Sequence, residues 1–344
     1  MSSSHDTVEF TEEERDRKAE HIDLALEEGM QVPLHPFDRY YFAHNALPEL
    51  ALAEIDPGVS FLGYDLKAPL LISCMTGGTE VATRINRRLA LAAEEVGIAI
   101  GVGSQRKAIE DPALVPSFEV RKFAPSVPVL ANLGAVQLNY GFGLAQCQAA
   151  VDMVGADALV LHLNPLQEAI QPEGQCDFRN LIAKMGDVAN HLSVPIIAKE
   201  VGSGISATTA QALQAVGIHI VDCAGVGGTS WAKIEAARAA DSEIGDLFGD
   251  WGIPTPENIR DLSQVSGVQV VGSGGIRTGL DTAKALALGA HLVGMARPFL
   301  KAAMESSAAV VSRARRTIRE LEVAMFCLGT RTPETLRGTE LRTR

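Results

Sequence analysis

Short apolar segments recur at nearly even intervals through the middle of the chain, and each ends in glycine or polar residues. Alanine-rich stretches with helical periodicity, such as INRRLALAAEEVG and TGLDTAKALALG, separate these segments. Apolar, β-branched segments that alternate with helices are typical of buried strands in a parallel sheet. The predicted strands cover residues 70–75, 98–103, 127–133, 158–163, 195–200, 219–225, 268–274 and 291–296.

Eight such strand–helix units predict an α/β fold, a (β/α)8 TIM barrel with an N-terminal helical extension. An open, doubly wound sheet is the alternative, but the even spacing of the units favours closure. We expect a single domain over residues 1–344. Within it we expect an N-terminal helix and irregular extension over 1–69, the barrel over 70–300, and a C-terminal helix and tail over 301–344.

The segments outside the regular pattern predict further helices. Thr11, followed by Glu14, is typical of a capping box, and Gly29 is a helix stop, so we expect a helix over about residues 12–28. The one long gap between strands contains TSWAKIEAARAADS, which predicts a helix over the barrel mouth. The stretch 301–328 predicts a final amphipathic helix before a polar tail.

Composition limits the classes of partner. The 344 residues carry a net charge of −12, from 30 basic and 42 acidic side chains. This balance argues against nucleic acid and anionic membrane surfaces, although a few cations or backbone amides suffice for a small anionic ligand. The five cysteines are odd in number and form no CxxC pair, which is typical of a reducing compartment. The sequence contains no signal-peptide or membrane-span pattern, so we expect a cytoplasmic protein.

The segment LHLNPLQE is the strongest candidate site. Side chains alternate along a strand, so His162 and Asn164 share one face, and Pro165 is expected to end the strand. Gln167 and Glu168 then follow in the loop at the carboxyl end of the strand, where ligands bind in parallel α/β proteins. A core histidine and a helix-starting glutamate are the alternatives for His162 and Glu168, but neither explains the whole cluster. Glu168 is the best candidate ligand for Mg²⁺.

Two glycine-rich turns follow the last two predicted strands: GSGGIRTG and GMARPF. Backbone N–H groups of such turns hold phosphate in many barrels, and glycine lets the chain approach closely. Turns without a ligand are the alternative, but the pair in these positions favours a phosphate site, to which Arg277 adds charge. Small and polar residues also gather in CMTGGT, GSQR, ANLG and GGTSW. Together they predict a flat phosphorylated cofactor, and FMN has that shape; Lys199 would lie near its ring or, equally well, form a salt bridge.

Cations near the N-terminus and at one strand end are candidates for a diphosphate. Arg17, Lys18 and His21 share a helix face in RKAEH, although a solvated surface with i,i+4 ion pairs is the stronger interpretation of the helix alone. Arg106 follows the GSQ turn at a strand end, where a charge-assisted contact to phosphate oxygens is expected. Cys223 has no base beside it in sequence and is interpreted as a small buried hydrophobe.

In this order, RKAEH, MTGG, GSQR, NLG, HLNPLQE, KEVGSGIS, GGTSW and GGIR resemble the type 2 isopentenyl diphosphate isomerases, from RKAEH to GMARPF. HLNPLQE and RKAEH are the specific motifs, whereas the FMN motifs are shared with other flavin barrels. The resemblance implies an FMN-binding barrel that interconverts isopentenyl and dimethylallyl diphosphate by a 1,3-proton shift in isoprenoid biosynthesis. It also implies reduced FMN, Mg²⁺, NAD(P)H as reductant, and a homo-oligomer, tetrameric or octameric.

The resemblance also implies roles for individual residues. The implied substrate-binding residues are Arg17, Lys18, His21, Ser104, Gln105, Arg106, His162, Asn164 and Gln167. The implied FMN-binding residues are Met75, Thr76, Gly77, Ser104, Asn132, Lys199, Thr229, Gly275, Ile276, Arg277, Ala296 and Arg297. Glu168 would bind Mg²⁺ that bridges to the diphosphate.

Gln167 and His162 are the predicted catalytic side chains. Only His162 in this segment titrates near neutrality, and Gln167 cannot serve as an ordinary base. We therefore expect the reduced flavin to move the protons, with Gln167 assisting in their positioning. A flavin-dependent oxidase of 2-hydroxy acids and a non-catalytic flavin or phosphate binder are the alternative functions. The first requires a histidine base beside an arginine that grips a carboxylate, and the second would show no turnover with reduced flavin.

Overall fold

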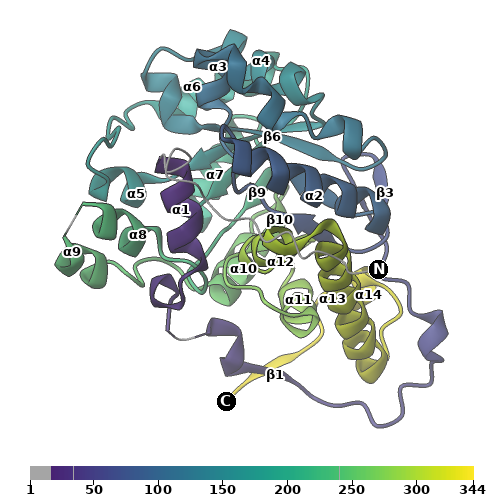
Figure 1. Cartoon of the computed structure of the whole chain (residues 1–344). Helices are drawn as coiled ribbons and strands as arrows, with labels where there is room; N and C mark the ends of the chain where they lie inside the picture. Colours follow the sequence, from purple (N-terminus) through teal and green to yellow (C-terminus); the bar gives the residue numbers. More distant parts are fainter. Residues whose placement is uncertain (1–16, 34, 240) are drawn as a thin grey trace.

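The computed structural model describes residues 17–33, 35–239 and 241–344, with the backbone alone for 17–19. Eight parallel strands close into a barrel in the order β10-β11-β4-β5-β6-β7-β8-β9, with helices around it (Figure 1). The barrel strands are β4 (Leu70–Ile72), β5 (Ala99–Gly101), β6 (Val129–Gly134), β7 (Ala158–Leu163), β8 (Ile196–Glu200), β9 (Ile220–Asp222), β10 (Gln269–Ser273) and β11 (Leu292–Met295). Each lies within a predicted strand or within one residue of it. The predicted (β/α)8 barrel is confirmed, and the open sheet is excluded.

The helices around the barrel end and begin at recognisable caps. In α2 (Glu80–Val96), Thr79 accepts a hydrogen bond from the Ala82 N–H, and Gly97 ends the helix at φ 76°. The other α-helices of the barrel region are α3 (Arg106–Glu110), α4 (Leu144–Val154), α5 (Pro165–Ile170), α6 (Leu181–His191), α7 (Ala207–Ala215), α8 (Trp231–Arg238), α9 (Ser242–Leu247), α10 (Thr255–Ser263) and α11 (Gly279–Ala287). Short 3-10 helices occupy Pro112–Phe118, Arg121–Phe123 and Ala135–Asn139. The predicted helix in the long gap is confirmed as α8, with α9 after it.

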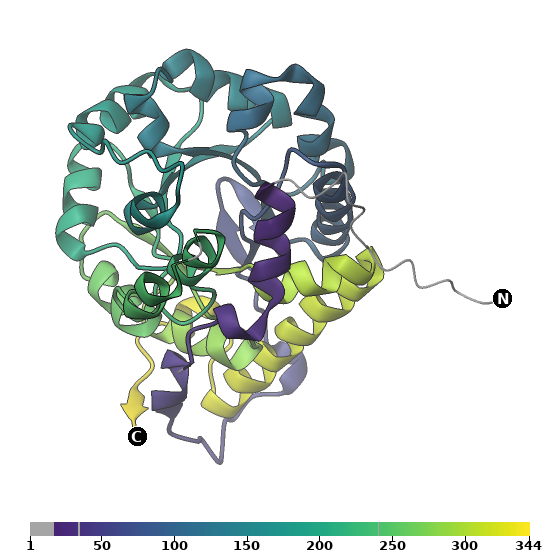
Figure 2. The same cartoon turned by 60° about the vertical axis from the view of Figure 1, so that its left-hand side comes forward.

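The N-terminal helix ends earlier than predicted, at Leu26 and not at residue 28. The described part of it, α1 (Arg17–Leu26), lies across the ring of barrel helices in Figure 2 and contacts α8 and α12. It ends before Gly29, because a separate 3-10 turn, Glu28–Met30, follows. The predicted cap at Thr11 and Glu14 lies outside the described residues.

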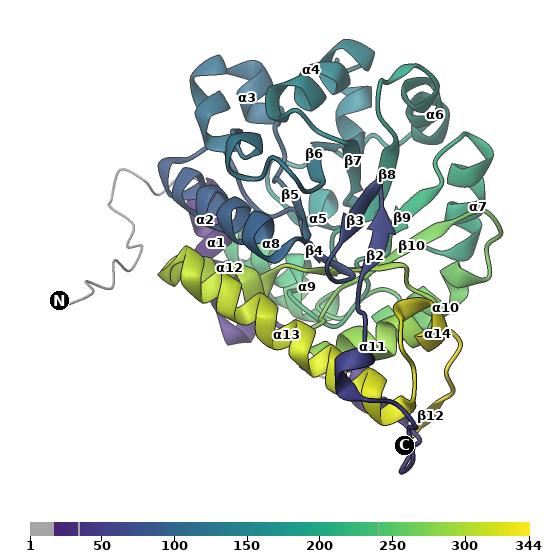
Figure 3. The same ribbon diagram turned by 90° about the vertical axis from the view of Figure 1, so that its right-hand side faces the viewer.

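The predicted irregular extension contains a hairpin that closes the amino end of the barrel. Strands β2 (Val59–Phe61) and β3 (Tyr64–Leu66) pair antiparallel, and Gly63 in their turn has φ 82°, which glycine adopts without strain (Figure 3). Phe61 is 2% exposed and packs, with Leu66, in the apolar cluster inside the barrel. The hairpin therefore fills the end of the barrel opposite the strand carboxyl termini.

The predicted tail is also ordered. Its last strand, β12 (Leu341–Thr343), pairs antiparallel with β1 (Tyr40–Phe42) of the extension. Two further 3-10 turns, Pro36–Arg39 and Leu52–Glu54, flank β1 on either side in the chain. Sequence patterning missed both strands because each is only three residues long and they pair across nearly the whole length of the chain.

The single C-terminal helix predicted over 301–328 is two helices. Helix α12 (Arg297–Glu305) and helix α13 (Ser307–Leu328) are divided at Ser306, whose side chain accepts from the Ala309 N–H at 3.0 Å and caps α13. A short helix α14 (Pro333–Leu336) leads into the tail. Among the described residues, no helix is both long enough and apolar enough to cross a membrane.

The inward-facing side chains change character along the strands. An apolar cluster inside the barrel includes Leu130, Val160, Ile197 and Val271. Two positions further along the same strands, and hence on the same face, come Asn132, His162, Lys199 and Ser273. The apolar interior therefore ends in a polar layer at the carboxyl end of the barrel.

Candidate active site

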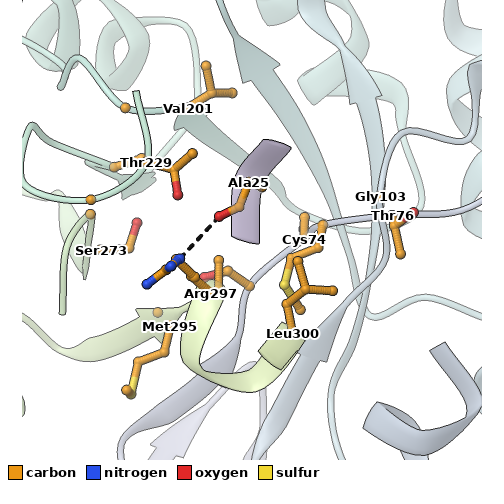
Figure 4. Close-up of a pocket in the computed structure, with 18 of the residues that line it drawn as sticks. Ala25, Cys74, Thr76, Gly103, Val201, Thr229, Ser273, Met295, Arg297 and Leu300 are labelled. Atoms are coloured by element: carbon orange, nitrogen blue, oxygen red, sulfur yellow. Dashed lines mark hydrogen bonds between the residues drawn. The ribbon is translucent and has the colours of Figure 1, made fainter. Parts of the chain in front are cut away.

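A cavity of about 890 Å³ opens above this polar layer, within the size range of ligand pockets. Figure 4 shows lining residues around it, with Thr229 and Ser273 on one side, Thr76 on the other, and Ala25 of α1 between them. Helices α12 and α13 complete one wall. The cavity lies where parallel barrels bind their ligands.

Most of the predicted site residues line this one cavity. The predicted flavin-binding residues that do so are Met75, Thr76, Gly77, Ser104, Asn132, Lys199, Thr229, Gly275, Ile276, Arg277, Ala296 and Arg297. The predicted substrate and metal residues that do so are His21, Ser104, Arg106, His162, Asn164, Gln167 and Glu168. The side chains of Arg17 and Lys18 lie outside the described part of the structure. Residues predicted from separate motifs are therefore brought together at one site.

Gln105 is placed differently from the other predicted substrate residues. Its side chain is fully buried, and its Oε1 accepts from the Asn132 N–H at 2.9 Å. Its Nε2 donates to the Ala150 carbonyl at 2.8 Å. A substrate contact through this side chain would require these bonds to break, so the structure gives Gln105 the role of holding β6 and α4 beside the site.

His162 is a neutral hydrogen-bonding group in the floor of the cavity. Its Nδ1 lies 2.9 Å from the Asn132 Oδ1, which can only accept, so Nδ1 carries the proton and Nε2 is left as an acceptor. Burial, with further contributions from the charges of Lys199 and Arg106, lowers the pKa of His162 to about 4. The ring is therefore uncharged at neutral pH and does not serve there as a general acid.

Lys199 lies in the cavity floor beside a buried acid. Its Nζ donates to the Glu200 carbonyl at 2.6 Å, and its neighbour in register on β9 is Asp222. Burial raises the pKa of Asp222, while Lys199 and the Ser273 hydroxyl, which donates at 2.5 Å, oppose that rise. Lys199 therefore lines the cavity and has an acid as its neighbour in register on the next strand. Asp222 was missed, although a charged residue on the inward face of a buried strand was a readable signal.

Gln167 and Glu168 lie in a helix and not in the predicted loop. Pro165 ends β7 as expected, but as the first residue of α5 its fixed φ starts a helix at once. The Glu168 Oε1 accepts from Asn164 at 2.9 Å, and its Oε2 accepts from the Gln171 side chain at 2.8 Å. The glutamate is 7% exposed and lies at the cavity edge, so the short helix fixes its carboxylate towards the site.

The surroundings of Glu168 fit a hard cation. Two buried amide oxygens beside it, Asn164 Oδ1 and Gln171 Oε1, have no hydrogen-bond partner among the described residues. Within the same residues, no group of three or more histidine, cysteine or carboxylate side chains forms a complete metal site. Mg²⁺ is typically held by one or two carboxylates together with phosphate oxygens and water, so Glu168 suits a metal shared with a diphosphate.

A second acid behind Gln167 was not predicted. Glu235 of α8 is fully buried, and its Oε1 accepts from the Gln167 Nε2 at 2.7 Å and lies 3.0 Å from the His21 Nε2. Arg238 donates to its Oε2 at 2.6 Å. Although burial acts to raise it, the hydrogen bonds and charges of these partners lower the pKa of Glu235 to about 2. This carboxylate therefore links α1, α5 and α8 at the mouth of the barrel. Glu235 was missed because, within the helix predicted for this segment, nothing in the sequence distinguishes it from a surface glutamate.

The glycine-rich turns have the geometry of a phosphate site. Gly274 and Gly275 have φ of 103° and 72°, and a Cβ on Gly275 would lie 2.2 Å from the Gly227 carbonyl oxygen. Thr278 then caps α11 by accepting from the Asp281 N–H at 3.1 Å. The turn therefore leads directly into a capped helix start, and Gly274, Gly275 and Arg277 of the turn line the cavity.

Arg297 is used differently from the prediction. Its Nε donates to the Ala25 carbonyl at 3.1 Å, as Figure 4 shows, and its Nη2 donates to the Leu26 carbonyl at 2.7 Å. The same Nη2 lies 2.8 Å from the Glu28 carboxylate, whose pKa Arg297 lowers. Its guanidinium therefore ties the end of α1 to the barrel, and it lines the cavity with most of its donors already used.

Comparisons with known proteins agree with this geometry. The family model of FMN-dependent dehydrogenases matches residues 164–343. The isopentenyl-diphosphate delta-isomerase of Synechococcus sp. is 54% identical over 90% of this chain and 91% of its own length. That of Nostoc sp. is 48% identical over 94% of both chains, and that of Rickettsia bellii is 47% identical over 95% of this chain and 97% of its own.

Solved structures share the barrel at much lower identity. A lactate oxidase from Pediococcus acidilactici superposes with a TM-score of 0.66 at 18% identity, covering 90% of this chain and 84% of that one. A mutant flavocytochrome b2 with pyruvate bound gives 0.68 at 16% identity, covering 95% and 82%. These two likenesses concern the fold alone. With relatives at 44–54% identity over 90–95% of its length, this chain belongs to the isopentenyl-diphosphate delta-isomerase family, on a barrel of the FMN-dependent dehydrogenase type.

Proposed function

We propose that this chain interconverts isopentenyl and dimethylallyl diphosphate, using reduced FMN and Mg²⁺ with NAD(P)H as reductant. The observation that carries the proposal is a single cavity that joins a flavin-type floor, at Asn132 and Lys199, to the Asn164–Gln167–Glu168 cluster. An amide and carboxylate cluster of this kind suits a diphosphate with its metal. A protein that only binds flavin would have no use for this cluster.

The reaction moves a double bond without net oxidation. One proton is added at the terminal carbon of isopentenyl diphosphate, another is lost from the carbon two positions away, and a state with cationic character lies between. FMN, when bound and reduced, supplies an electron-rich ring whose nitrogens give and take protons. The Gly275 turn would hold its phosphate, and Lys199 and Asn132 would lie by its ring.

Gln167 positions the reacting part of the substrate. Its Nε2 is fixed by Glu235 at 2.7 Å, and its Oε1 accepts from Asn164 at 3.2 Å, so both ends of the amide are held. An amide neither gains nor loses a proton near neutral pH, so its contribution is orientation and a fixed dipole. The buried negative charge of Glu235 behind it favours a cationic state in the cavity.

The diphosphate would lie between Arg106 and Glu168. Arg106 lines the cavity with its side chain 28% exposed, and its remaining contacts are loose, at 3.4 Å to Gln175 and 3.9 Å to Glu110. Glu168 would hold Mg²⁺ against the same phosphates. Arg17 and Lys18 of α1 are the further predicted diphosphate ligands, and His21 on the same helix lines the cavity.

The oxidase alternative fits this site less well. It needs a histidine whose pKa lies near the working pH, because general bases act best there. His162 does lie near Arg106, but its pKa of about 4 makes it a weak base at neutral pH. Its Nδ1–H also donates a hydrogen bond to the Asn132 amide oxygen. A carboxylate in that position would make the histidine a stronger base, whereas an amide does not.

The test is direct. Purified protein is supplied with FMN, Mg²⁺ and NADPH without oxygen, and isopentenyl diphosphate is followed by NMR. We expect dimethylallyl diphosphate only while the flavin is reduced, and loss of turnover when Mg²⁺ is chelated. Oxidation of a 2-hydroxy acid, with no isomerisation, would favour the oxidase; bound flavin with neither activity would favour a binder. Sedimentation of the same sample tests the expected tetramer or octamer.

A further inference from the structure

At the end of the cavity where a flavin phosphate is expected, one arginine has an N–H group without a hydrogen-bond partner among the described residues. Arg277 and Arg297 were the predicted cations there, but Arg297 donates to the end of α1. Arg277 itself makes one distant contact, from its Nη2 to the Gly227 carbonyl at 3.5 Å. A phosphate dianion at this turn would therefore have fewer side-chain donors than the sequence implied.

Helix α13 supplies a further candidate because it packs on the start of α11. A Cβ on Gly279 would lie 2.1 Å from the Thr317 carbonyl oxygen, so glycine is required for this close approach. The Gly279 N–H also donates to the Glu320 carboxylate at 2.8 Å. The middle of α13 is therefore fixed against the helix that follows the phosphate turn.

Arg313 lies one turn earlier on α13, and the Thr317 hydroxyl donates to its carbonyl at 3.0 Å. The Arg313 side chain lines the cavity, and its Nη2 donates to the carbonyl oxygen of Arg277 in the phosphate turn. Its Nε is buried and has no hydrogen-bond partner among the described residues. A buried donor without an acceptor is costly, so the site is short of one acceptor that the described protein atoms do not supply.

We propose that Arg313 is a direct ligand of the flavin phosphate, held in place by its bond to the turn that wraps that phosphate. One edge of a planar guanidinium can donate to the loop while an N–H on another edge reaches a phosphate oxygen. The proposal rests on the flavin binding proposed above and extends the phosphate site from the barrel loops to the C-terminal helix. Neither the sequence motifs nor the glycine turns indicated a residue so far along the chain.

Neighbouring cations on the same wall are less suited to the role. Arg316 also lines the cavity, but its side chain is 74% exposed and its Nε is 2.9 Å from the Glu320 carboxylate. Arg315 is 62% exposed and pairs with Glu95 at 3.0 Å, outside the cavity lining. Arg315 is therefore a matched control: it is the same residue type on the same helix, with no place in the site.

The experiment compares two flavins that differ in the phosphate alone. Apo-protein carrying R313M, R313K or R315M is titrated with FMN and with riboflavin, and binding is followed by quenching of flavin fluorescence. We expect R313M to weaken FMN binding roughly tenfold or more, since a charge-assisted hydrogen bond is lost, and to change riboflavin binding by no more than about twofold. R313K should lose less FMN affinity, and R315M should match the unmodified protein.

The outcomes separate a ligand from a structural clamp. Equal weakening of FMN and riboflavin would mean that Arg313 merely holds the turn, and unchanged FMN binding would also overturn the proposal. If R313M does not fold, the same comparison is made with R313K, where a selective loss of FMN affinity supports the proposal and an equal loss of both flavins overturns it. Because the readout is flavin binding, failure of isomerisation in an FMN-replete protein would count against the proposed function and leave this inference intact.

Discussion

The two ends of the barrel use the same strands for opposite purposes. At the amino end, the β2–β3 hairpin inserts Phe61 and Leu66 into an apolar interior. At the carboxyl end, two residues further along the strands, the inward face carries Asn132, His162 and Lys199 under an open cavity. Burial at the first end stabilises the fold, whereas the second end keeps polar groups away from bulk water so that a ligand can use them. Stability and function are therefore separable along a single strand.

The largest effect is expected at the closed end. Phe61→Ala removes a side chain that is 2% exposed, and such truncations cost about 3–5 kcal/mol in the free energy of unfolding. Urea unfolding measures this loss, with Leu47→Ala, at a position 80% exposed, as the control. Flavin affinity of the folded variant should be unchanged. A variant that keeps its stability but loses flavin would break the division between the two ends.

Glu235 is the exception at the open end, because its charge contributes to stability. Its folded-state pKa of about 2 lies below its ordinary 4.5, so the stabilisation is complete above about pH 4.5 and is lost as the pH falls towards 2. We expect Glu235→Gln to lower the free energy of unfolding at pH 7 by up to roughly 3 kcal/mol, and the gap to the unmodified protein to close in acid. Urea unfolding at several pH values tests this, with exposed Glu243→Gln as the control. A gap that does not vary with pH would contradict it.

Gln167→Ala should reduce turnover and cost about 1–3 kcal/mol of stability, because the buried Glu235 carboxylate loses the hydrogen bond from the Gln167 amide. Losing an oriented amide at the reacting centre is expected to slow isomerisation by about 100-fold, which corresponds to roughly 2.7 kcal/mol in the barrier. The NMR assay measures the rate, and Gln264→Ala, at an exposed position just after α10, is the control. Near-normal turnover with FMN bound would remove Gln167 from the mechanism.

The smallest effect concerns His162 alone. With its pKa lowered to about 4, chiefly by burial, the ring should stay neutral down to about pH 5. Nitrogen NMR of labelled histidine reports both the protonation state and the tautomer, which we expect to be the Nδ1–H form facing Asn132. A titration near the ordinary value of 6.5 would show that the floor is wetter than its burial implies.

The barrel was predictable because its strands and helices carry strong local periodicity. The polar cluster around His162 was predictable for the same reason, since polar residues on a buried strand face are conspicuous in sequence. Gln105 and Arg297 show where this reasoning ends: both lie in the right motif, but their donors are used by Ala150 and by the end of α1. Which acceptor each of these donors binds depends on residues that are distant in the chain.

Residues contributed by helices were harder to find. Glu235 and Arg313 are ordinary charged positions in amphipathic segments, and nothing local distinguishes them from a solvated surface. The first becomes a buried carboxylate when α8 packs on α5, and the second reaches the phosphate turn when α13 packs on Gly279. The β1–β12 pair was missed for a related reason: each strand is stabilised by a partner from the other end of the chain, which the local pattern of residues does not indicate.

The pairing of β1 with β12 has a consequence for the order in which the protein matures on the ribosome. The segment that holds α1 over the cavity is made first, yet Arg297 and β12, which anchor that segment, are made near the end. The barrel strands can associate as they emerge, while the covering segment must wait for its anchors. Because Gly275, Arg297 and Arg313 of the cavity are also made late, we expect both the closing of this segment and the binding of flavin to follow the synthesis of nearly the whole chain.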